Sequence, residues 1–402
     1  MLDLSWIRNN VESFKYNLTV RNYDVHCVDE ILALDEERKK IVTELNKLRE
    51  MANLAAKEKK IIPGKALKEQ IKVLNCEEVA IVKKLNDFLL RIPNVISDKS
   101  PIGKDSSENK EIKVFGETCK RQLSHDVIMD KSGLQENTKE LSGSRFVALR
   151  GFMARLEFAL CSWMFNHNVQ AGFDPVSVPF IVNKSALYNS GQLPKFEDEF
   201  FSFDDKALIP TGEVPLVNIV ENKNFDVSKL PIRMTTLSSC FRKEAGSAGR
   251  DTKGLIRLHQ FQKVEIVSVV HPDESEQEHL FLLNHSEMML QKLGLPYRVL
   301  ELCSGDMGFT AHRQFDLEVW MGGSDKYVEV ASCSNCTDFQ ARRMNAKVTS
   351  GNTKVFLHTL NCSALPIGRT LAAIIENNTV DGIFTVPKVL VDYIGVETYK
   401  WF

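Results

Sequence analysis

The chain has 402 residues, of which 51 are Lys or Arg and 53 are Asp or Glu, so its formal net charge is -2, and 43% of its residues are hydrophobic. This is the balance of an ordinary globular protein with two or three domains, and it excludes net charge as a source of nucleic-acid binding. No run approaches the roughly 18 apolar residues of a membrane span, and the N-terminus lacks the apolar core of a signal peptide. We therefore expect a cytoplasmic protein without membrane contact.

Residues 28–91 carry a hydrophobic pattern with a spacing of three and four residues in two successive stretches. Pro63-Gly64 lies between the stretches, so the pattern predicts two helices at about 28–62 and 65–92 joined by a short turn. Two such helices pack as an antiparallel two-helix coiled-coil arm.

The charge along this arm is uneven. From Lys47 to Lys72, near the expected turn, there are eight Lys or Arg and three Asp or Glu, whereas the rest of the arm has six basic and nine acidic residues. A solvated helix surface would also carry charges, but a basic tip on an acidic hairpin favours a partner with a phosphate backbone. The lysines that we expect to contact this partner are Lys57, Lys59, Lys60, Lys65 and Lys68.

A polar segment from residue 93 to residue 111 follows the arm and predicts two domains, 1–111 and 112–402. The second domain mixes helices and strands, with an amphipathic helix expected at 144–166 and an apolar strand at 173–182. Because proline cannot donate to a strand ladder, Pro175 and Pro179 predict an edge or interface position for that strand.

Nine cysteines are scattered through the chain, often within apolar runs, which favours reduced and buried thiols over a disulfide framework. Cys333 and Cys336 form the only CxxC pair. Since no further ligands stand nearby in the sequence, we expect no zinc.

The most informative stretch is FRKEAGSAGRDTKGLIRLHQFQKVE, residues 241–265. Its first half combines glycines with charges of both signs, which suits a loop that approaches a charged ligand. Its second half alternates, so one face of a strand carries Arg257, His259, Phe261, Lys263 and Glu265. A solvated edge hairpin is the plain alternative. Ionisable groups around one aromatic ring favour the floor of a site that stacks a flat ring and handles charge.

This stretch resembles motif 2 of the class II aminoacyl-tRNA synthetases, in the form found in bacterial-type seryl-tRNA synthetases. LNCSALPIGRTLAAIIEN at 360–377 resembles motif 3, and the resemblance extends over the whole chain. It implies an α+β fold, in which a class II antiparallel sheet is flanked by helices and preceded by the coiled-coil arm. The absence of GxGxxG and GxxxxGK[ST] patterns agrees with such a sheet. A homodimer is implied as well, because the helix and proline-bearing strand resemble motif 1.

The implied function is serine–tRNA ligase. Such an enzyme activates L-serine with ATP to seryl-adenylate and then transfers the seryl group to tRNA(Ser), and to tRNA(Sec) where one exists. The steps depend on positioning and charge neutralisation more than on a general base.

The resemblance also implies residue roles at the ATP. Arg242 contacts the α-phosphate, Glu244 the adenine edge and Arg369 the γ-phosphate, and these three are the expected catalytic residues. Phe261 stacks on the base, while Glu329 and Ser332 hold Mg²⁺. The full ATP-binding set carried over from the family is Arg242, Lys243, Glu244, Leu258, Phe261, Glu329, Val330, Ala331, Ser332 and Arg369.

For serine, the resemblance implies Thr211, Gly212, Glu213, Glu265, Asn361 and Ser363. Hydrogen bonds to the substrate hydroxyl would reject alanine and glycine. Three positions depart from the usual family sequence. Gly212 replaces an alanine, whereas Cys362 and Ala364 replace glycines, so we expect an effect on the tightness of the serine pocket.

Two other functions remain open from the residues. A synthetase-derived binding protein typically loses the motif 2 or motif 3 arginine, and both are kept here. An amino acid ligase that acts on a carrier protein lacks the arm and uses zinc, whereas this chain has the arm and no zinc set.

Overall fold

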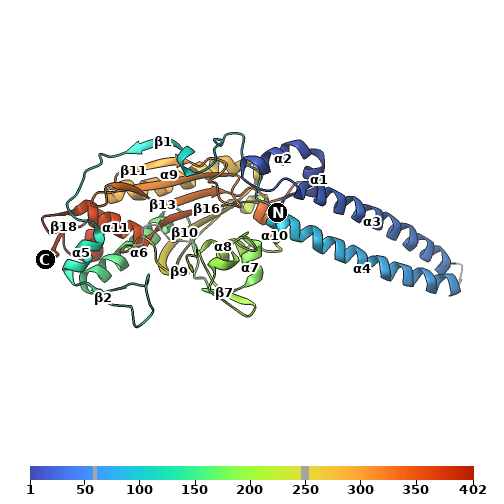
Figure 1. The fold of residues 1–402 in the computed structure, drawn as a ribbon, viewed down its shortest axis with the longest axis horizontal. Coiled ribbons are helices and arrows are strands. Elements are labelled where there is room, and N and C mark those ends of the chain that lie inside the picture. The colour runs from blue at the N-terminus through green and yellow to red at the C-terminus, as the bar shows by residue number, and fades with distance from the viewer. Residues whose placement is uncertain (58–60, 246–252) are drawn as a thin grey trace. The chain divides into compact units, whose positions relative to one another are not determined.

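The computed structural model describes residues 1–57, 61–245 and 253–402, and within the helix that begins at Ile61 the side chains are described from Gly64 onward. The chain divides into two compact units, Met1–Val95 and Ile96–Phe402. Figure 1 shows the elements of each unit.

The N-terminal unit consists of helices only. Two short helices, α1 (Leu4–Asn9) and α2 (Val11–Val20), precede two helices of 31 residues each, α3 (Cys27–Lys57) and α4 (Ile61–Arg91). Apolar side chains from α3 and α4 meet along their seam, which contains Leu34, Ile41, Leu45, Ile71, Leu74 and Ile81. The coiled-coil arm that the hydrophobic spacing predicts is therefore confirmed.

The sequence suggested that Pro63 and Gly64 lie between the two helices. In the structure they lie within the first turns of α4. Proline is tolerated at a helix start because the first N–H groups of a helix have no partner within it. Arg38, which interrupts the seam pattern, pairs with Asp35 at 2.8 Å, and Arg8 pairs with the same carboxylate at 2.9 Å. Asp35 is only 1% exposed, so the two arginines compensate its buried charge.

The lysines expected at the arm tip are partly described. Lys57, Lys65 and Lys68 are exposed, whereas Lys59 and Lys60 lie outside the described residues.

The larger unit is built on one eight-stranded sheet with the order β1-β11-β12-β13-β16-β10-β9-β4. All neighbours pair antiparallel except β4, which runs parallel to β9. The strands are β1 (Lys110–Phe115), β4 (Asp174–Pro175), β9 (Ile232–Phe241), β10 (Gln260–Val270), β11 (Tyr297–Glu301), β12 (Arg313–Met321), β13 (Lys326–Asn335) and β16 (His358–Pro366).

Three helices cover one face of this sheet and form the main core with it: α6 (Gly151–Gln170), α9 (Ser275–Leu293) and α11 (Ile367–Asn378). A second core lies where α8 (Glu213–Asn218) and α10 (Phe339–Met344) pack against β9 and β10. The smaller elements are α5 (His125–Ser132), α7 (Lys184–Asn189), α12 (Val391–Ile394), β2 (Gln135–Glu136), β3 (Ala148–Leu149), β5 (Ile181–Asn183), β6 (Ser202–Phe203), β7 (Lys206–Leu208), β8 (Asn224–Asp226), β14 (Lys347–Ser350), β15 (Thr353–Phe356), β17 (Thr379–Val380), β18 (Ile383–Thr385) and β19 (Thr398–Lys400).

Two expectations about the start of this unit can be compared with the structure. Pro175 lies in β4, the last strand of the sheet, so its predicted edge position is confirmed. The single strand expected at 173–182 is wrong, because only Asp174–Pro175 and Ile181–Asn183 are strands and Pro179 lies between them. The helix expected at 144–166 begins only at Gly151, whose φ is +57°, because residues 148–149 form β3 and pair with β2. The glycine takes the left-handed conformation that turns the chain from strand to helix.

All nine cysteines are free, and six of them are buried. Cys76 in the N-terminal unit and Cys119 in the larger unit are exposed. Within the described part of the chain, no helix has both the length and the apolar character needed to cross a membrane.

Candidate active site

Two adjoining cavities lie against β10 and β16, on the face of the sheet opposite α9, and they share residues such as Arg242, Lys263 and Ser363. Their volumes are about 100 and 390 Å³. Because side chains alternate along a strand, Asn361 and Ser363 point into the larger cavity. Cys362 and Ala364 point the other way and are part of the main core.

Arg242 and Phe261 define one side of the smaller cavity. The guanidinium carbon of Arg242 lies 5.3 Å from the centroid of the Phe261 ring, and Arg242 Nε donates to Pro210 O at 3.2 Å. Glu244 has a φ of +53° and pairs with Arg257. The arrangement sets a flat aromatic face beside a fixed cation, which suits a ligand with a flat ring and an attached anionic group.

Arg369 lies at the other end of this cavity and is held by the backbone. Its Nε donates to Ile256 O at 3.1 Å and its Nη1 donates to Glu329 O at 2.8 Å. The Glu329 carboxylate lies 3.5 Å from Nη1. The two carbonyl contacts fix the plane of the guanidinium, and the nearby Glu329 carboxylate compensates part of its charge.

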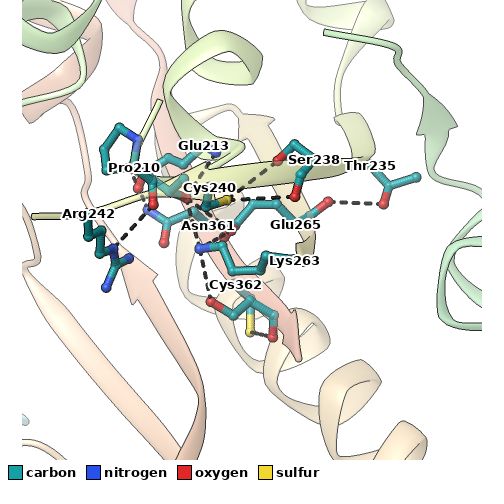
Figure 2. Close-up of polar contacts among 12 residues, drawn as sticks. Pro210, Glu213, Thr235, Ser238, Cys240, Arg242, Lys263, Glu265, Asn361 and Cys362 are labelled. Carbon is teal, nitrogen blue, oxygen red and sulfur yellow. Dashed lines mark hydrogen bonds and ion pairs between the residues drawn. The ribbon is translucent and has the colours of Figure 1, made fainter. Parts of the chain in front are cut away.

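The larger cavity ends in a pocket of amides and carboxylates. Gln340 Nε2 and Asn361 Nδ2 both donate to Glu213 Oε1, at 2.7 and 2.9 Å. Thr211 Oγ1 donates to Glu265 Oε2 at 3.1 Å. Figure 2 shows Glu213, Glu265 and Asn361 converging on this region from separate segments.

Lys263 connects one carboxylate of the pocket, that of Glu265, to the hydroxyl groups of the pocket. Its ammonium forms an ion pair with Glu265 and donates to Thr211 Oγ1 at 2.9 Å and to Ser363 Oγ at 3.5 Å (Figure 2). The register between β10 and β16 shifts between Lys263 and Glu265, which marks a β-bulge. Bulges of this kind re-aim side chains next to functional sites.

Glu213 is the carboxyl whose protonation the site perturbs near neutral pH. Burial and the negative charge of Glu265 raise its pKa to about 7, against the lowering effect of the Gln340 hydrogen bond and of the cations Lys263 and Arg242. The pocket therefore changes its charge near pH 7.

The structure brings twelve of the sequence-selected residues into the two cavities: Thr211, Glu213, Arg242, Glu244, Leu258, Phe261, Glu265, Glu329, Ser332, Asn361, Ser363 and Arg369. Four others do not line them. Gly212 is buried beside Thr236, the side chain of Lys243 is exposed, and Val330 and Ala331 are buried in the main core. Within the described ranges, no three or more His, Cys, Asp or Glu residues gather as a metal site.

Several lining residues were absent from the selected set. Lys263 and Arg257 carried a signal, because they belong to the alternating polar face that the sequence shows. His259 of the same face does not line either cavity, and its Nδ1 contacts Arg242 O at 3.0 Å. Gln314, whose Nε2 donates to Ser332 Oγ at 2.7 Å, lines the larger cavity and lies in a segment without any such pattern. Gln340 lines neither cavity but supports Glu213, which does.

The three departures from the usual family sequence have packing explanations. At Gly212, a Cβ atom would lie 2.7 Å from Thr236 Cγ2 and 3.2 Å from Glu265 Cβ, so the threonine methyl occupies the room of an alanine. Cys362 contacts Ser286 of α9, with 3.2 Å between Sγ and Oγ, and Ala364 is buried with it. Their side chains fill the core and do not narrow the pocket, contrary to our expectation.

Comparison with known proteins agrees with this architecture. Residues 1–96 match the seryl-tRNA synthetase N-terminal domain, and residues 195–378 match the tRNA synthetase class II core domain (G, H, P, S and T). A serine–tRNA ligase of Rickettsia prowazekii (strain Madrid E) is 43% identical over 100% of both chains. One of Rickettsia rickettsii (strain Sheila Smith) is 44% identical over 98% of both chains.

Solved structures give the same result. The seryl-tRNA synthetase of Pyrococcus horikoshii complexed with ATP has a TM-score of 0.94 and 34% identity, and the match covers 100% of this chain and 99% of the other. The cytoplasmic serine–tRNA ligase of Naegleria fowleri in complex with AMP has a TM-score of 0.89 and 32% identity, and covers 97% and 96%.

The sheet, its helices and the two cavities therefore form the catalytic core of a class II aminoacyl-tRNA synthetase. Within that class, the chain belongs to the seryl-tRNA synthetase family. The family, the fold class and the serine–tRNA ligase function predicted from the sequence are confirmed.

The contact at Gly212 generates a test of packing. We expect Gly212→Ala to destabilise the fold by about 1–3 kcal/mol, because the added methyl overlaps the Thr236 methyl. The double variant Gly212→Ala/Thr236→Ala should recover most of that loss in urea denaturation. Gly64→Ala in α4 is the control, since nothing lies within 4 Å of its Cβ position. Additive effects of the two pocket substitutions would contradict the proposed overlap.

Proposed function

We propose that the two cavities bind ATP and L-serine side by side and join them as seryl-adenylate, which then passes its seryl group to tRNA. The observation that carries this proposal is the placement of two backbone-held arginines and an aromatic face next to a pocket of carboxylates, amides and hydroxyls. One side suits a nucleotide, and the other suits a small zwitterion with a hydroxyl group.

In the proposed first step, the serine carboxylate attacks the α-phosphate of ATP, a new P–O bond forms, and pyrophosphate leaves. Arg242 contacts the α-phosphate, where negative charge grows in the transition state, and the adenine stacks on Phe261 with Glu244 at its edge. Arg369 contacts the γ-phosphate. Support comes from the fixed guanidinium planes, because charge stabilisation is strongest when its groups need no reorganisation.

In the serine pocket, Glu213 and Glu265 receive the ammonium group, and Ser363 and Asn361 stand near the hydroxyl. Lys263 compensates part of the acidic charge, so that the pocket does not repel the serine carboxylate. A site that hydrogen-bonds the hydroxyl leaves buried partners unpaired when alanine or glycine binds.

Glu329 and Ser332 would hold Mg²⁺. One carboxylate and one hydroxyl beside the phosphate subsite form the incomplete oxygen set that magnesium accepts when phosphate oxygens complete it. When bound, the ion supplies positive charge to the phosphate oxygens.

The partners follow from the family and from the two units. We propose that the arm binds tRNA(Ser), and tRNA(Sec) where one exists, through its basic tip, and that the reaction takes place in the cytoplasm. We place a homodimer interface at α6 and the β4 edge. Phe158 of α6 is 70% exposed in the single chain, and an exposed phenylalanine on a helix otherwise packed in the core is typical of an interface.

The direct test of the first step is serine-dependent exchange between ATP and pyrophosphate. We expect Arg242→Ala to lower kcat by about 10² or more, because it removes an interaction made mainly in the transition state. Circular dichroism should show an unchanged fold. A folded Arg242→Ala variant with near-normal exchange would remove Arg242 from this role, and a wild-type chain without exchange would reject the function.

The raised pKa of Glu213 generates a pH prediction. Above pH 7 Glu213 is ionised and attracts the serine ammonium group, whereas below pH 7 it becomes protonated and neutral. We therefore expect kcat/KM for serine in the exchange reaction to rise as the pH increases through about 7. Glu213→Gln should lower kcat/KM at pH 8 and remove this step from the profile. An unchanged profile in the variant would assign the step to another group.

The basic tip should act on tRNA and not on serine activation, since every described residue that lines the cavities belongs to the unit 96–402. Lys65→Gln/Lys68→Gln should weaken tRNA binding and lower its salt slope by up to about 0.9 for each lost phosphate contact. Lys83→Gln/Lys84→Gln, a second exposed pair on α4, is the matched control. Filter binding across a salt series measures both variants. Equal slopes in the two would show that the tip is only a solvated surface.

A further inference from the structure

His125 and Glu376 form a buried pair outside both cavities. His125 is the first residue of α5 and is 2% exposed, and Glu376 lies near the end of α11 and is 0% exposed. The reaction proposed above uses neither residue. Two buried ionisable groups 251 positions apart in the sequence nevertheless need a physical reason, because burying them is costly unless their hydrogen bonds are satisfied.

The Glu376 carboxylate is fully supplied with donors. Its Oε1 accepts hydrogen bonds from His125 Nδ1 at 2.6 Å, from the His125 backbone N–H at 3.0 Å and from Ser324 Oγ at 2.9 Å. Its Oε2 receives the N–H groups of Gly323 and Ser324 at 2.9 and 2.8 Å. Burial acts to raise the pKa of this carboxyl, but the hydrogen bonds from His125 and Ser324 hold it below the ordinary value.

The ionised carboxylate determines the tautomer of His125. Since Nδ1 must carry the proton that it donates to Glu376, Nε2 of the neutral ring is an acceptor. That acceptor receives the Leu255 backbone N–H at 3.2 Å. Gly254, the residue before Leu255, has a φ of +56°. A Cβ atom at Gly254 would lie 2.2 Å from His125 Nε2. The backbone can approach the ring only because residue 254 has no side chain.

The segment that His125 contacts also forms part of the wall of the smaller cavity. Leu255 and Ile256 line that cavity, and Ile256 O accepts from Arg369 Nε at 3.1 Å. Arg369 lies in the first turn of α11, seven residues before Glu376, which is about two helical turns, so both side chains leave the same side of the helix. The contacts therefore close a ring that runs from Glu376 through His125, Leu255 and Ile256 to Arg369 and back along α11.

We propose that His125 and Glu376 are positioning residues that hold the Leu255–Ile256 backbone against α11 and thereby fix the guanidinium of Arg369 for the terminal phosphate of ATP. This inference rests on the proposed function. It assigns a role in ATP binding to two residues that touch no substrate, and it leaves serine binding to the other cavity.

Two substitutions of His125 separate its two hydrogen bonds. Asparagine places an amide near the Nδ1 position, so His125→Asn keeps the donor to Glu376 and loses the acceptor for Leu255 N–H. Glutamine extends an amide oxygen to the Nε2 position, so His125→Gln keeps the acceptor. In pyrophosphate exchange, we expect His125→Asn to raise KM for ATP about 5- to 10-fold, the size of one hydrogen bond, with KM for serine unchanged. His125→Gln should recover part of that loss.

Controls exclude a general loss of structure. His358→Asn removes a largely enclosed histidine at the start of β16 that lines neither cavity, and it should leave both KM values unchanged. Should His125→Asn not fold, Gly254→Ala displaces the same contact from the other side and should show the same rise in KM for ATP alone. A folded His125→Asn with normal KM for ATP, or with equal rises for ATP and serine, would overturn the inference.

The role through Arg369 is tested by a double-mutant cycle. If His125 acts through Arg369, then His125→Asn should add little in an Arg369→Ala background, and additive losses would overturn the inference. Arg369→Ala alone distinguishes a failure of the γ-phosphate assignment from a failure of the positioning role. Normal exchange in that variant would reject the γ-phosphate assignment in the proposed function, whereas impaired exchange with an inert His125→Asn would reject only the positioning role.

Discussion

The pocket depends on the ion pair between Lys263 and Glu265, which is almost completely enclosed, with side-chain exposures of 7% and 2%. Either charge alone would be costly to bury, and the pair is tolerated because Thr211 and Ser363 supply the remaining hydrogen bonds. Lys263 and Glu265 point to the same cavity because they are two residues apart on β10, and the extra residue of the register shift lies on β16, between Ser363 and Pro366. Removing one partner would leave a buried charge without its counter-charge, which would destabilise the fold.

The rest of the site is arranged around the two faces of β10 and β16. One face joins α6, α9 and α11 in the core, and the other carries the polar groups of the cavities. This division explains how substitutions at Cys362 and Ala364 were accommodated. A larger side chain on the core face is absorbed by packing against α9, whereas one on the cavity face would meet the substrate. Packing also explains Gly212. The methyl group of Thr236 fills the space that the side chain of an alanine at position 212 would take.

Local patterns were sufficient to predict much of this architecture. The spacing in residues 28–91 predicted the coiled-coil arm. The alternation from Arg257 to Glu265 predicted the polar face of β10 correctly for Phe261, Lys263 and Glu265, whereas Arg257 and His259 precede the strand. Other features depend on tertiary contacts that one segment cannot reveal. Pro63 suggested a turn but occupies the start of α4, where a missing N–H costs little. Gln340 reaches Glu213 only because α10 packs beside β16. His125 contacts Glu376 although 251 positions separate them in the sequence.

The exposure of the cysteines has a practical consequence. Burial raises the pKa of the Cys161 and Cys336 thiols to about 12, so these groups stay protonated and unreactive at neutral pH. The exposed thiols are Cys76 and Cys119, one in each compact unit. The natural sequence thus offers a pair of attachment points for fluorophores. Energy transfer between two dyes on the unmodified chain would measure the separation of the two units with and without tRNA.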